Sequence, residues 1–295
     1  MAELADKLVQ GVYRAGWAGA GRIPNSLTRW VFRPVSRWVV WRNGKPVRRL
    51  RRNLEIATGH PVSDDLARAA IRSYLRAFHE VLALPHLSRA RVVGQVKVHD
   101  EARLRAEFAR RGVVVALPHS GNWDLAGAWA CGTGLPVTTV AERLSDAEYA
   151  AFVRFREQLG MEVLSHRDPD SLDRLVEAVG RGRVICLIAD RDLSQAGVPV
   201  GWRGVSITMP VGPALVARRS GAALIPAVCR YVGPEMHISL GPVIESEPGR
   251  AGLTAMTQQV ADFFAAEIGR QPADWHMLQR FFPEDASAHK STRAT

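Results

Sequence analysis

One short segment of the chain combines the end of a strand, a turn and residue types that could catalyse proton transfer. The apolar run 113–117 is followed by Pro118 and His119, and Asp124 comes five residues after the histidine. Chemistry in open α/β sheets collects outside the carboxyl ends of strands. We expect the Asp124 carboxylate to hold the Nδ1–H of His119, which leaves Nε2 able to take a proton from an alcohol. The same pattern also fits a histidine that merely ends a strand and an aspartate that favours the positive end of a helix dipole.

Four motifs, in order along the chain, resemble those of the bacterial lipid acyltransferases that carry an HX4D signature. Within that family the chain is most similar to the actinobacterial phosphatidylinositol mannoside acyltransferase branch, which is related to the late acyltransferases of lipid A synthesis. The resemblance covers roughly residues 1–283. The motifs are residues 119–124 (HSGNWD), 138–143 (TTVAER), 188–193 (IADRDL) and 208–214 (TMPVGPA).

The resemblance implies that a sugar hydroxyl attacks the thioester of acyl-CoA, a co-substrate, with no other cofactor and no metal. In such a reaction a neutral imidazole removes the hydroxyl proton, a carboxylate aligns the imidazole, and fixed donors stabilise the oxyanion. The hydroxyl belongs to the acceptor, so no Ser or Cys nucleophile is required. Ser120, beside the histidine, is therefore interpreted as a turn or cap residue.

A second acidic residue is expected at the same edge of the sheet. The apolar run 184–189 ends at Asp190, and the ends of parallel strands share one edge, so Asp190 could approach His119. The resemblance implies that an acidic residue at this motif, where glutamate also occurs, completes the relay with the HX4D pair. The alternative is that the acids of this motif form ion pairs with Arg191 or Arg203.

Three further residues are candidates for substrate binding. Glu142 and Arg143 close another strand on the same expected edge, and the resemblance implies that they bind the acceptor or the thioester. It also implies that Arg156 contacts the acyl-CoA. A charge pair at the end of a strand is commonly structural, and that alternative stays open.

The positive charge of the chain is concentrated at its start. Residues 1–60 contain 12 Lys and Arg against 3 Asp and Glu, whereas the other 235 residues contain 27 against 26. Such a concentration is typical of a surface that faces a polyanion. Tryptophans interleaved with arginines suit the headgroup region of an anionic membrane, and no helix-turn-helix, RRM or zinc-finger pattern supports nucleic acid. The predicted membrane-binding residues are Arg29, Trp30, Arg33, Arg37, Trp38, Trp41 and Arg42. The alternative is that the tryptophans pack on the body of the protein.

Hydropathy and domain organisation favour a peripheral protein. No apolar stretch reaches the ~18–20 residues that span a bilayer, and the first thirty residues lack the apolar region of a secretory signal. We therefore expect the protein on the cytoplasmic face of the cell membrane. Residues 1–60 are predicted to be basic amphipathic membrane-docking helices, 61–283 an α/β acyltransferase core and 284–295 a flexible tail.

The body of the chain alternates apolar strands with helices. This order predicts an α/β fold with a largely parallel central sheet flanked by helices on both faces. Ser63 is expected to cap a helix over residues 64–84, which Pro85 ends. Strands are expected near 113–117, 137–140, 161–165, 184–189, 222–229 and 236–244, and helices near 102–111, 123–131, 145–159, 170–180, 210–220 and 252–269.

Together these features predict a peripheral-membrane acyltransferase. It would move a long-chain acyl group, of palmitoyl type, from acyl-CoA to a mannose hydroxyl of a phosphatidylinositol mannoside, with His119 as general base oriented by Asp124. One alternative is a non-catalytic protein that binds membranes or polyanions. Another is an acyl-CoA hydrolase that uses the same His–Asp pair with water.

Overall fold

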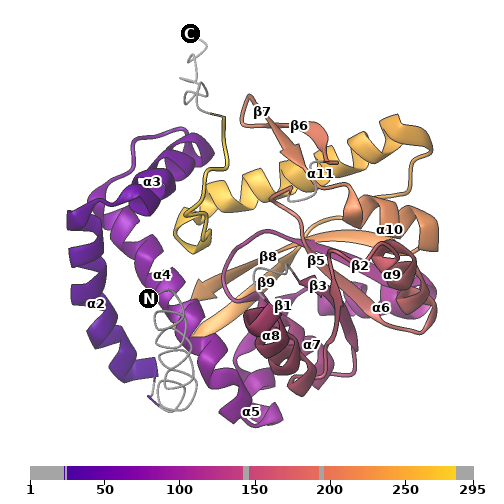
Figure 1. The fold of residues 1–295 in the computed structure, drawn as a ribbon, viewed down its shortest axis with the longest axis horizontal. Coiled ribbons are helices and arrows are strands. Elements are labelled where there is room, and N and C mark those ends of the chain that lie inside the picture. Colours follow the sequence, from indigo (N-terminus) through magenta and orange to yellow (C-terminus); the bar gives the residue numbers. More distant parts are fainter. Residues whose placement is uncertain (1–22, 24, 142–145, 193–195, 284–295) are drawn as a thin grey trace.

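The computed structural model of the protein describes residues 23, 25–141, 146–192 and 196–283; the side chains of residues 25, 26, 29 and 146–148 lie outside that description. The described residues form a seven-stranded sheet with the strand order β1-β9-β8-β2-β5-β3-β4 and helices on both faces (Figure 1). The strands are β1 (Val96–His99), β2 (Val113–Leu117), β3 (Val137–Ala141), β4 (Glu162–Ser165), β5 (Val184–Ile188), β8 (Ala223–Val232) and β9 (Glu235–Leu240).

The sheet is largely parallel, as the sequence predicts. The five strands from β8 to β4 all run in the same direction. At one edge β9 turns back antiparallel to β8, and β1 pairs parallel with β9. Strand β1 is not expected from the sequence because its four residues alternate apolar and polar types over too short a run.

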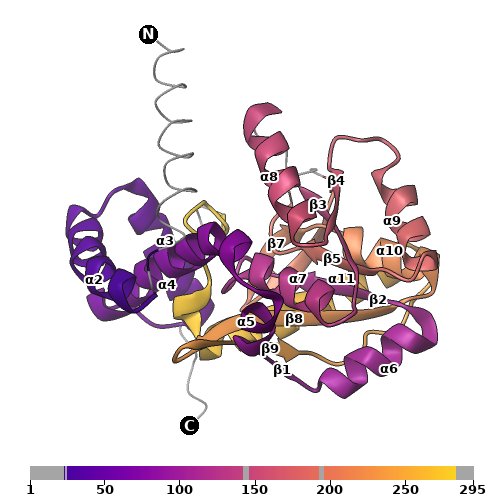
Figure 2. The ribbon, with the colours of Figure 1, turned by 90° about the horizontal axis from the view of Figure 1, so that it is seen from below.

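The helices alternate with the strands over most of the described chain, whereas four of them precede the first strand of the sheet. The described helices are α2 (Asn25–Arg42), α3 (Lys45–Thr58), α4 (Asp64–Ala83), α5 (Arg89–Gly94), α6 (Glu101–Arg111), α7 (Trp123–Gly132), α8 (Asp146–Gln158), α9 (Ser171–Gly180), α10 (Gly212–Ser220) and α11 (Gly249–Arg270), with short 3-10 turns η2 (Leu84–His86) and η3 (Pro272–Asp274). The expected cap of α4 is confirmed, since the hydroxyl of Ser63 accepts a hydrogen bond from the N–H of Leu66. Figures 1 and 2 show α2, α3 and α4 together on one side of the molecule.

Strand β2 lies in the middle of the core and is buried on both faces. Val114 and Ala116 belong to the cluster that also contains side chains of α10 and α11. Val113, Val115 and Leu117 belong to the cluster that contains side chains of α7. Burial of such side chains stabilises the fold by ~1.5–3 kcal/mol each, and burial on both faces explains why the strand is a continuous apolar run.

An antiparallel hairpin stands apart from the main sheet. It consists of β6 (Val198–Trp202) and β7 (Val205–Met209). Arg203 and Gly204 connect the strands with φ of 51° and 81°, the geometry of a two-residue turn that matches strand twist. The ring of Trp202 is fully buried and stacks on Trp275, with ring centroids 5.8 Å apart. No pattern in the sequence predicts this hairpin, which packs against Trp275 through Trp202.

Within the described ranges, no helix combines the length and the apolar character that crossing a bilayer requires. Side chains of α3 and α4 enter the same core cluster as those of the sheet. The N-terminal helices from α3 onward are therefore packed parts of the body.

Candidate active site

His119 lies in the loop directly after β2, and the carboxylate of Asp190, which follows β5, holds its imidazole. The Nδ1–H donates to Oδ1 of Asp190 at 2.5 Å, and the backbone N–H of His119 donates to Oδ2 at 2.9 Å. The two strands pair with Leu117 beside Ile188, so each reaches its polar residue two positions later at the same edge. Asp190 is fully buried, whereas the imidazole is 30% exposed. None of the described residues is a hydrogen-bond partner of Nε2, so this atom can meet a substrate.

The Asp190 carboxylate is ionised although it is buried. Burial opposes ionisation and is the largest single effect, but the charge of His119 and the hydrogen bonds from His119 and Trp275 together hold the pKa of Asp190 below its ordinary value. The indole N–H of Trp275 donates to Oδ2 at 3.0 Å. An ionised carboxylate at Nδ1 fixes the tautomer in which Nε2 is unprotonated and stabilises the imidazolium that forms when Nε2 takes a proton.

A distant segment of the chain fixes the backbone of the histidine loop. Residues 119–121 pair antiparallel with residues 274–276 through backbone hydrogen bonds of 2.8 and 2.9 Å and a bridge between the middle residues. Gly121 has φ of 56°, and a Cβ at this position would lie 2.8 Å from the carbonyl oxygen of Cys229. Only glycine fits so closely against the neighbouring backbone in this conformation.

His276, in the same segment, is a neutral structural histidine. Its side chain is buried, and burial lowers its pKa to about 3. The hydroxyl of Ser73 donates to Oδ1 of Asp274 at 2.6 Å and lies 3.0 Å from Nε2 of His276. Because the hydroxyl proton is used in the first bond, the Nε2–H of His276 donates to the serine oxygen. This chain of hydrogen bonds connects α4 to the segment that braces the histidine loop.

Asp124 does not orient His119, and the prediction of that hydrogen bond from the sequence is wrong. Oδ1 of Asp124 instead accepts a hydrogen bond from Nε of Arg156 at 2.7 Å, and the two side chains are 4% and 11% exposed. Asp124 lies in the first turn of α7, which begins at Trp123, while Asp190 already occupies Nδ1 of the imidazole. The ion pair therefore joins α7 to α8.

A buried network that the sequence analysis missed fixes the start of α7. Asn122 is the N-cap, and its Oδ1 accepts a hydrogen bond from the N–H of Leu125 at 2.9 Å. Its Nδ2 donates to the buried carboxylate of Glu80 at 3.3 Å, which also accepts from the hydroxyl of Tyr231 and from Nε of Arg76, both at 2.7 Å. The turn residues predict the cap, but nothing local predicts partners on α4 and β8.

A polar cavity of about 690 Å³ opens beside Asp190. It is lined by residues 190–192 after β5, residues 206–208 of β7 and residues 280–283. Arg191 and Arg280 contribute positive charge to this lining. The alternative that the acids of this motif form ion pairs with Arg191 or Arg203 is wrong for Asp190, because the hydrogen-bond partners of its carboxylate are His119 and Trp275. Asp190 belongs to the lining of this cavity, whereas His119 does not.

Three of the predicted site residues lie outside the described structure. Glu142 and Arg143 fall in the range 142–145, and the side chain of Arg29 is likewise not described. Their predicted roles in substrate and membrane binding stay predictions. The predicted contact of Arg156 with acyl-CoA also stays a prediction, although its pairing with Asp124 is now known.

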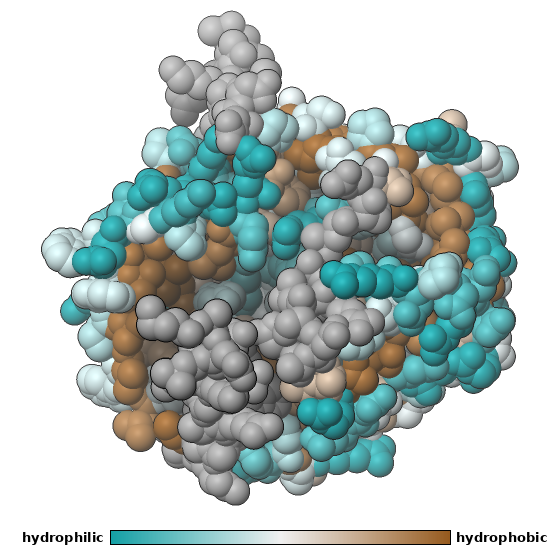
Figure 3. Space-filling view, viewed as in Figure 1, coloured by the Kyte–Doolittle hydropathy of each residue, from teal (hydrophilic) through white to brown (hydrophobic). Residues whose placement is uncertain are grey.

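The tryptophans of α2 face solvent. Trp30, Trp38 and Trp41 are 71%, 59% and 77% exposed, so the alternative that they pack on the body is wrong. The guanidinium of Arg33 lies 5.5 Å from the ring centre of Trp30, and that of Arg42 lies 5.7 Å from that of Trp38. Six of the ten large apolar side chains exposed in the described residues belong to α2, and two more belong to α4. Figure 3 shows hydrophobic residues over these helices, in a hollowed area with hydrophilic neighbours.

Residues 5–283 match the family model described as bacterial lipid A biosynthesis acyltransferase. A protein named phosphatidylinositol mannoside acyltransferase from Mycolicibacterium smegmatis is 42% identical over 290 residues, which cover 95% of this chain and 93% of that protein. A protein of the same name from Mycobacterium tuberculosis is 40% identical over 288 residues, which cover 93% of this chain and 89% of that protein.

Proposed function

Because the chain belongs to the bacterial lipid A biosynthesis acyltransferase family, we propose that it transfers a long-chain acyl group, of palmitoyl type, from acyl-CoA to a mannose hydroxyl of a phosphatidylinositol mannoside. The names of the two mycobacterial relatives support this acceptor. The observation that carries the proposal is the short hydrogen bond between Nδ1 of His119 and the buried Asp190, with Nε2 left for a substrate.

The proposed reaction uses His119 first as a base and then as an acid. Nε2 takes the proton of the acceptor hydroxyl while its oxygen bonds to the thioester carbonyl carbon. The tetrahedral intermediate then expels the CoA thiolate, which takes the proton back from the imidazolium. Asp190 keeps its negative charge throughout and stabilises the imidazolium across the hydrogen bond at Nδ1. Loss of this base should lower turnover by ~10²–10⁴-fold or more.

Substrate contacts are proposed around the same strand ends. Glu142 and Arg143 follow directly after β3, whose neighbour in the sheet is β5. We propose that they bind the acceptor or the thioester, and that Arg156, held in place by Asp124, contacts the acyl-CoA. Acyl-CoA is then a co-substrate, and the scheme requires no resident cofactor.

The exposed face of α2 is proposed to dock on an anionic membrane. Its tryptophans have the amphipathic character that suits the headgroup boundary, and Arg33, Arg37 and Arg42 add exposed positive charge beside them. This arrangement would bring the body of the protein against the cytoplasmic face of the cell membrane as a peripheral enzyme. Each cation near an anionic surface contributes ~1 kcal/mol to binding.

One experiment separates the proposed activity from its alternatives. Purified protein is incubated with palmitoyl-CoA and a panel of lipid acceptors, and the products are identified by mass spectrometry, with His119→Ala as the control. An acylated phosphatidylinositol mannoside that the control does not form supports the transferase. Release of free fatty acid at the same rate without acceptor supports the hydrolase instead. Vesicle binding with no turnover at all supports a non-catalytic membrane protein.

A further inference from the structure

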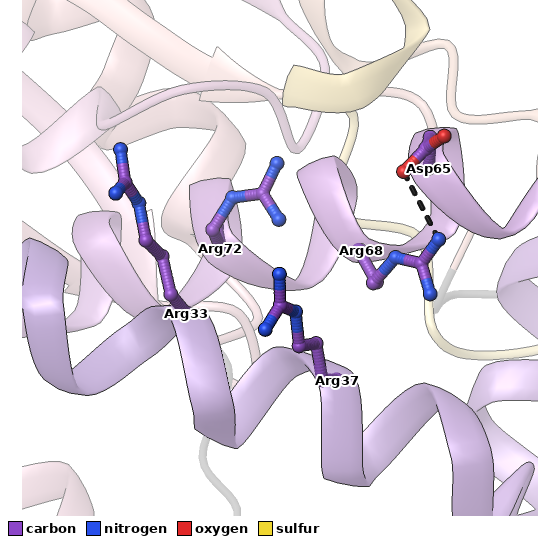
Figure 4. A pocket seen from close by; sticks show the side chains of 5 residues that line it. All are labelled: Arg33, Arg37, Asp65, Arg68 and Arg72. Carbon is purple, nitrogen blue, oxygen red and sulfur yellow. Dashed lines mark hydrogen bonds and ion pairs between the residues drawn. The ribbon is translucent and has the colours of Figure 1, made fainter.

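Helices α2 and α4 lie side by side and form a pocket with an excess of positive charge. The pocket has a volume of about 400 Å³. Arg33 and Arg37 line it from α2, and Asp65, Arg68 and Arg72 line it from α4 (Figure 4). The two arginines on each helix are four positions apart, so each pair lies on one side of its helix. Four guanidinium groups thus share a small space with one carboxylate.

Among the described residues, most of this positive charge has no ionic partner. Arg68 forms ion pairs with Asp65 at 3.0 Å and with Asp64 at 3.8 Å. Within the described part of the chain, the guanidinium groups of Arg33, Arg37 and Arg72 form no ion pair and no hydrogen bond. The side chain of Asp65 is itself 93% exposed, so it neutralises little of the pocket.

The electrostatics of Arg72 show the same imbalance. Burial lowers the pKa of this guanidinium most, and the charges of Arg33, Arg68 and Arg37 lower it further, while Asp65 acts in the opposite direction. A bound anion would relieve the repulsion among the four side chains. Planar guanidinium groups bind phosphate through paired hydrogen bonds, and several of them can share its oxygens.

The surroundings of the pocket indicate a lipid as the source of that anion. Trp30, Arg33, Arg37 and Trp41 follow one another on α2 at intervals of three or four residues, so the two tryptophans flank the pocket arginines on the same side. Both tryptophans are more than two-thirds exposed. A soluble phosphate would not require exposed indole rings around its site, whereas a headgroup phosphate lies at the depth where tryptophan partitions.

We propose that this arginine pocket binds the phosphate of an anionic bilayer phospholipid. The pocket would add one defined contact with a lipid to the general attraction between the positive charges of α2 and an anionic membrane. The proposal therefore rests on the membrane part of the proposed function. It also connects docking to the active site through α4. Arg72 lines the pocket, and the next residue, Ser73, is hydrogen-bonded to Asp274 in the segment that braces the histidine loop. A lipid in the pocket therefore sets the orientation of the active site toward the membrane.

The test compares two arginines of α2 that differ in their place on the helix. Arg37 lines the pocket, whereas Arg42 is exposed on the same helix and does not. Co-sedimentation is measured with phosphatidylcholine vesicles that contain either phosphatidylinositol or, at equal surface charge, oleate, whose anion is a carboxylate. On phosphatidylinositol, Arg42→Gln should weaken binding about fivefold, the effect of one surface cation. Arg37→Gln should weaken it roughly 10- to 100-fold, because charge-assisted hydrogen bonds are lost as well.

A second variant keeps the charge and changes only the geometry. Arg37→Lys should bind oleate vesicles as the wild type does, but it should lose most of the preference for phosphatidylinositol, because lysine lacks the planar fork. Equal losses for Arg37→Gln and Arg42→Gln, with Arg37→Lys like the wild type on both vesicles, overturn the pocket and leave diffuse docking. No binding of the wild type to either vesicle overturns the docking and the pocket together. Tight binding of glycerol phosphate that Arg37→Gln abolishes, with vesicle binding unchanged, overturns the lipid as the source.

Discussion

Replacement of Asp190 by asparagine should remove most of the turnover, because the hydrogen bonds at this carboxylate determine which way the new amide faces. Among the described residues, Oδ2 accepts from the backbone N–H of His119 and from the indole N–H of Trp275, whereas Oδ1 accepts only from the Nδ1–H of His119. Asparagine satisfies the two donors with its oxygen, so its NH₂ group faces Nδ1. The imidazole must then carry its proton on Nε2. That is the atom that has to take the proton of the acceptor hydroxyl.

The size of the effect follows from this change of tautomer. The corresponding Asp-to-Asn change in a serine protease triad lowers kcat by about 10⁴-fold. We expect a loss of ~10³–10⁴-fold for Asp190→Asn, which corresponds to ~4–5.5 kcal/mol in the activation free energy. KM for acyl-CoA should change little, since Asp190 is fully buried and acts mainly on the transition state. Initial rates of acyl transfer to phosphatidylinositol mannoside, read by mass spectrometry, give both constants.

Asp124→Asn is the matched control, because the same change is made at another buried aspartate, one that does not contact His119. It removes the ionic partner of Arg156 and leaves that charge poorly compensated, a loss that costs ~3–5 kcal/mol at buried sites. The Tm should fall, and the remaining turnover should keep the pH profile of the wild type. Wild-type turnover in a folded Asp190→Asn protein would refute the reasoning. So would a changed pH profile in Asp124→Asn together with an unchanged one in Asp190→Asn.

Three further predictions concern the histidine loop and the segment, residues 274–276, that braces it. Trp275→Phe keeps an aromatic ring but removes the hydrogen bond to Oδ2 of Asp190. Initial rates of acyl transfer should show kcat lowered about tenfold or more, and a wild-type kcat would contradict this contribution. His276, with its pKa lowered to about 3, is neutral in the folded protein while the unfolded chain takes up a proton below pH ~6.5. The free energy of unfolding should therefore decrease as the pH falls from 6.5 to 3, by about 5 kcal/mol in total from this group. Urea titrations over this pH range should show a smaller decrease for His276→Gln. Parallel curves of unfolding free energy against pH for the two proteins would contradict this. Gly121→Ala forces a positive φ on alanine and places its Cβ 2.8 Å from the carbonyl oxygen of Cys229. Chemical denaturation should show a loss of ~1–3 kcal/mol or more in the free energy of unfolding. A Tm equal to that of the wild type would disprove the close fit.

The sequence predicts the central part of the fold well because its signals are local. The apolar runs of β2 and β5 show strands that are buried on both faces, and such strands belong to parallel sheets. Parallel strands end at one edge, and this alone brings Asp190 within reach of His119. The serine cap of α4 and the asparagine cap of α7 are likewise visible from residue types and spacing.

What the sequence does not predict depends on contacts between distant residues. The spacing of His119 and Asp124 favours a pair, but helix α7 begins at Trp123 and α8 supplies Arg156 to the aspartate instead. Trp275 donates to Asp190 from 85 positions further along the chain, and no periodicity marks that contact. Spacing shows which residues share an element. Which atoms meet is decided by how the elements pack.

The pairing of residues 119–121 with residues 274–276 determines when the active site becomes complete during synthesis of the chain. During synthesis, His119 and Asp190 leave the ribosome well before Trp275 does. Until residues 274–276 emerge, the carboxylate lacks its indole donor and the histidine loop lacks its neighbouring backbone. Competence for acyl transfer therefore arises only after residues 274–276 have been made and have paired with the histidine loop.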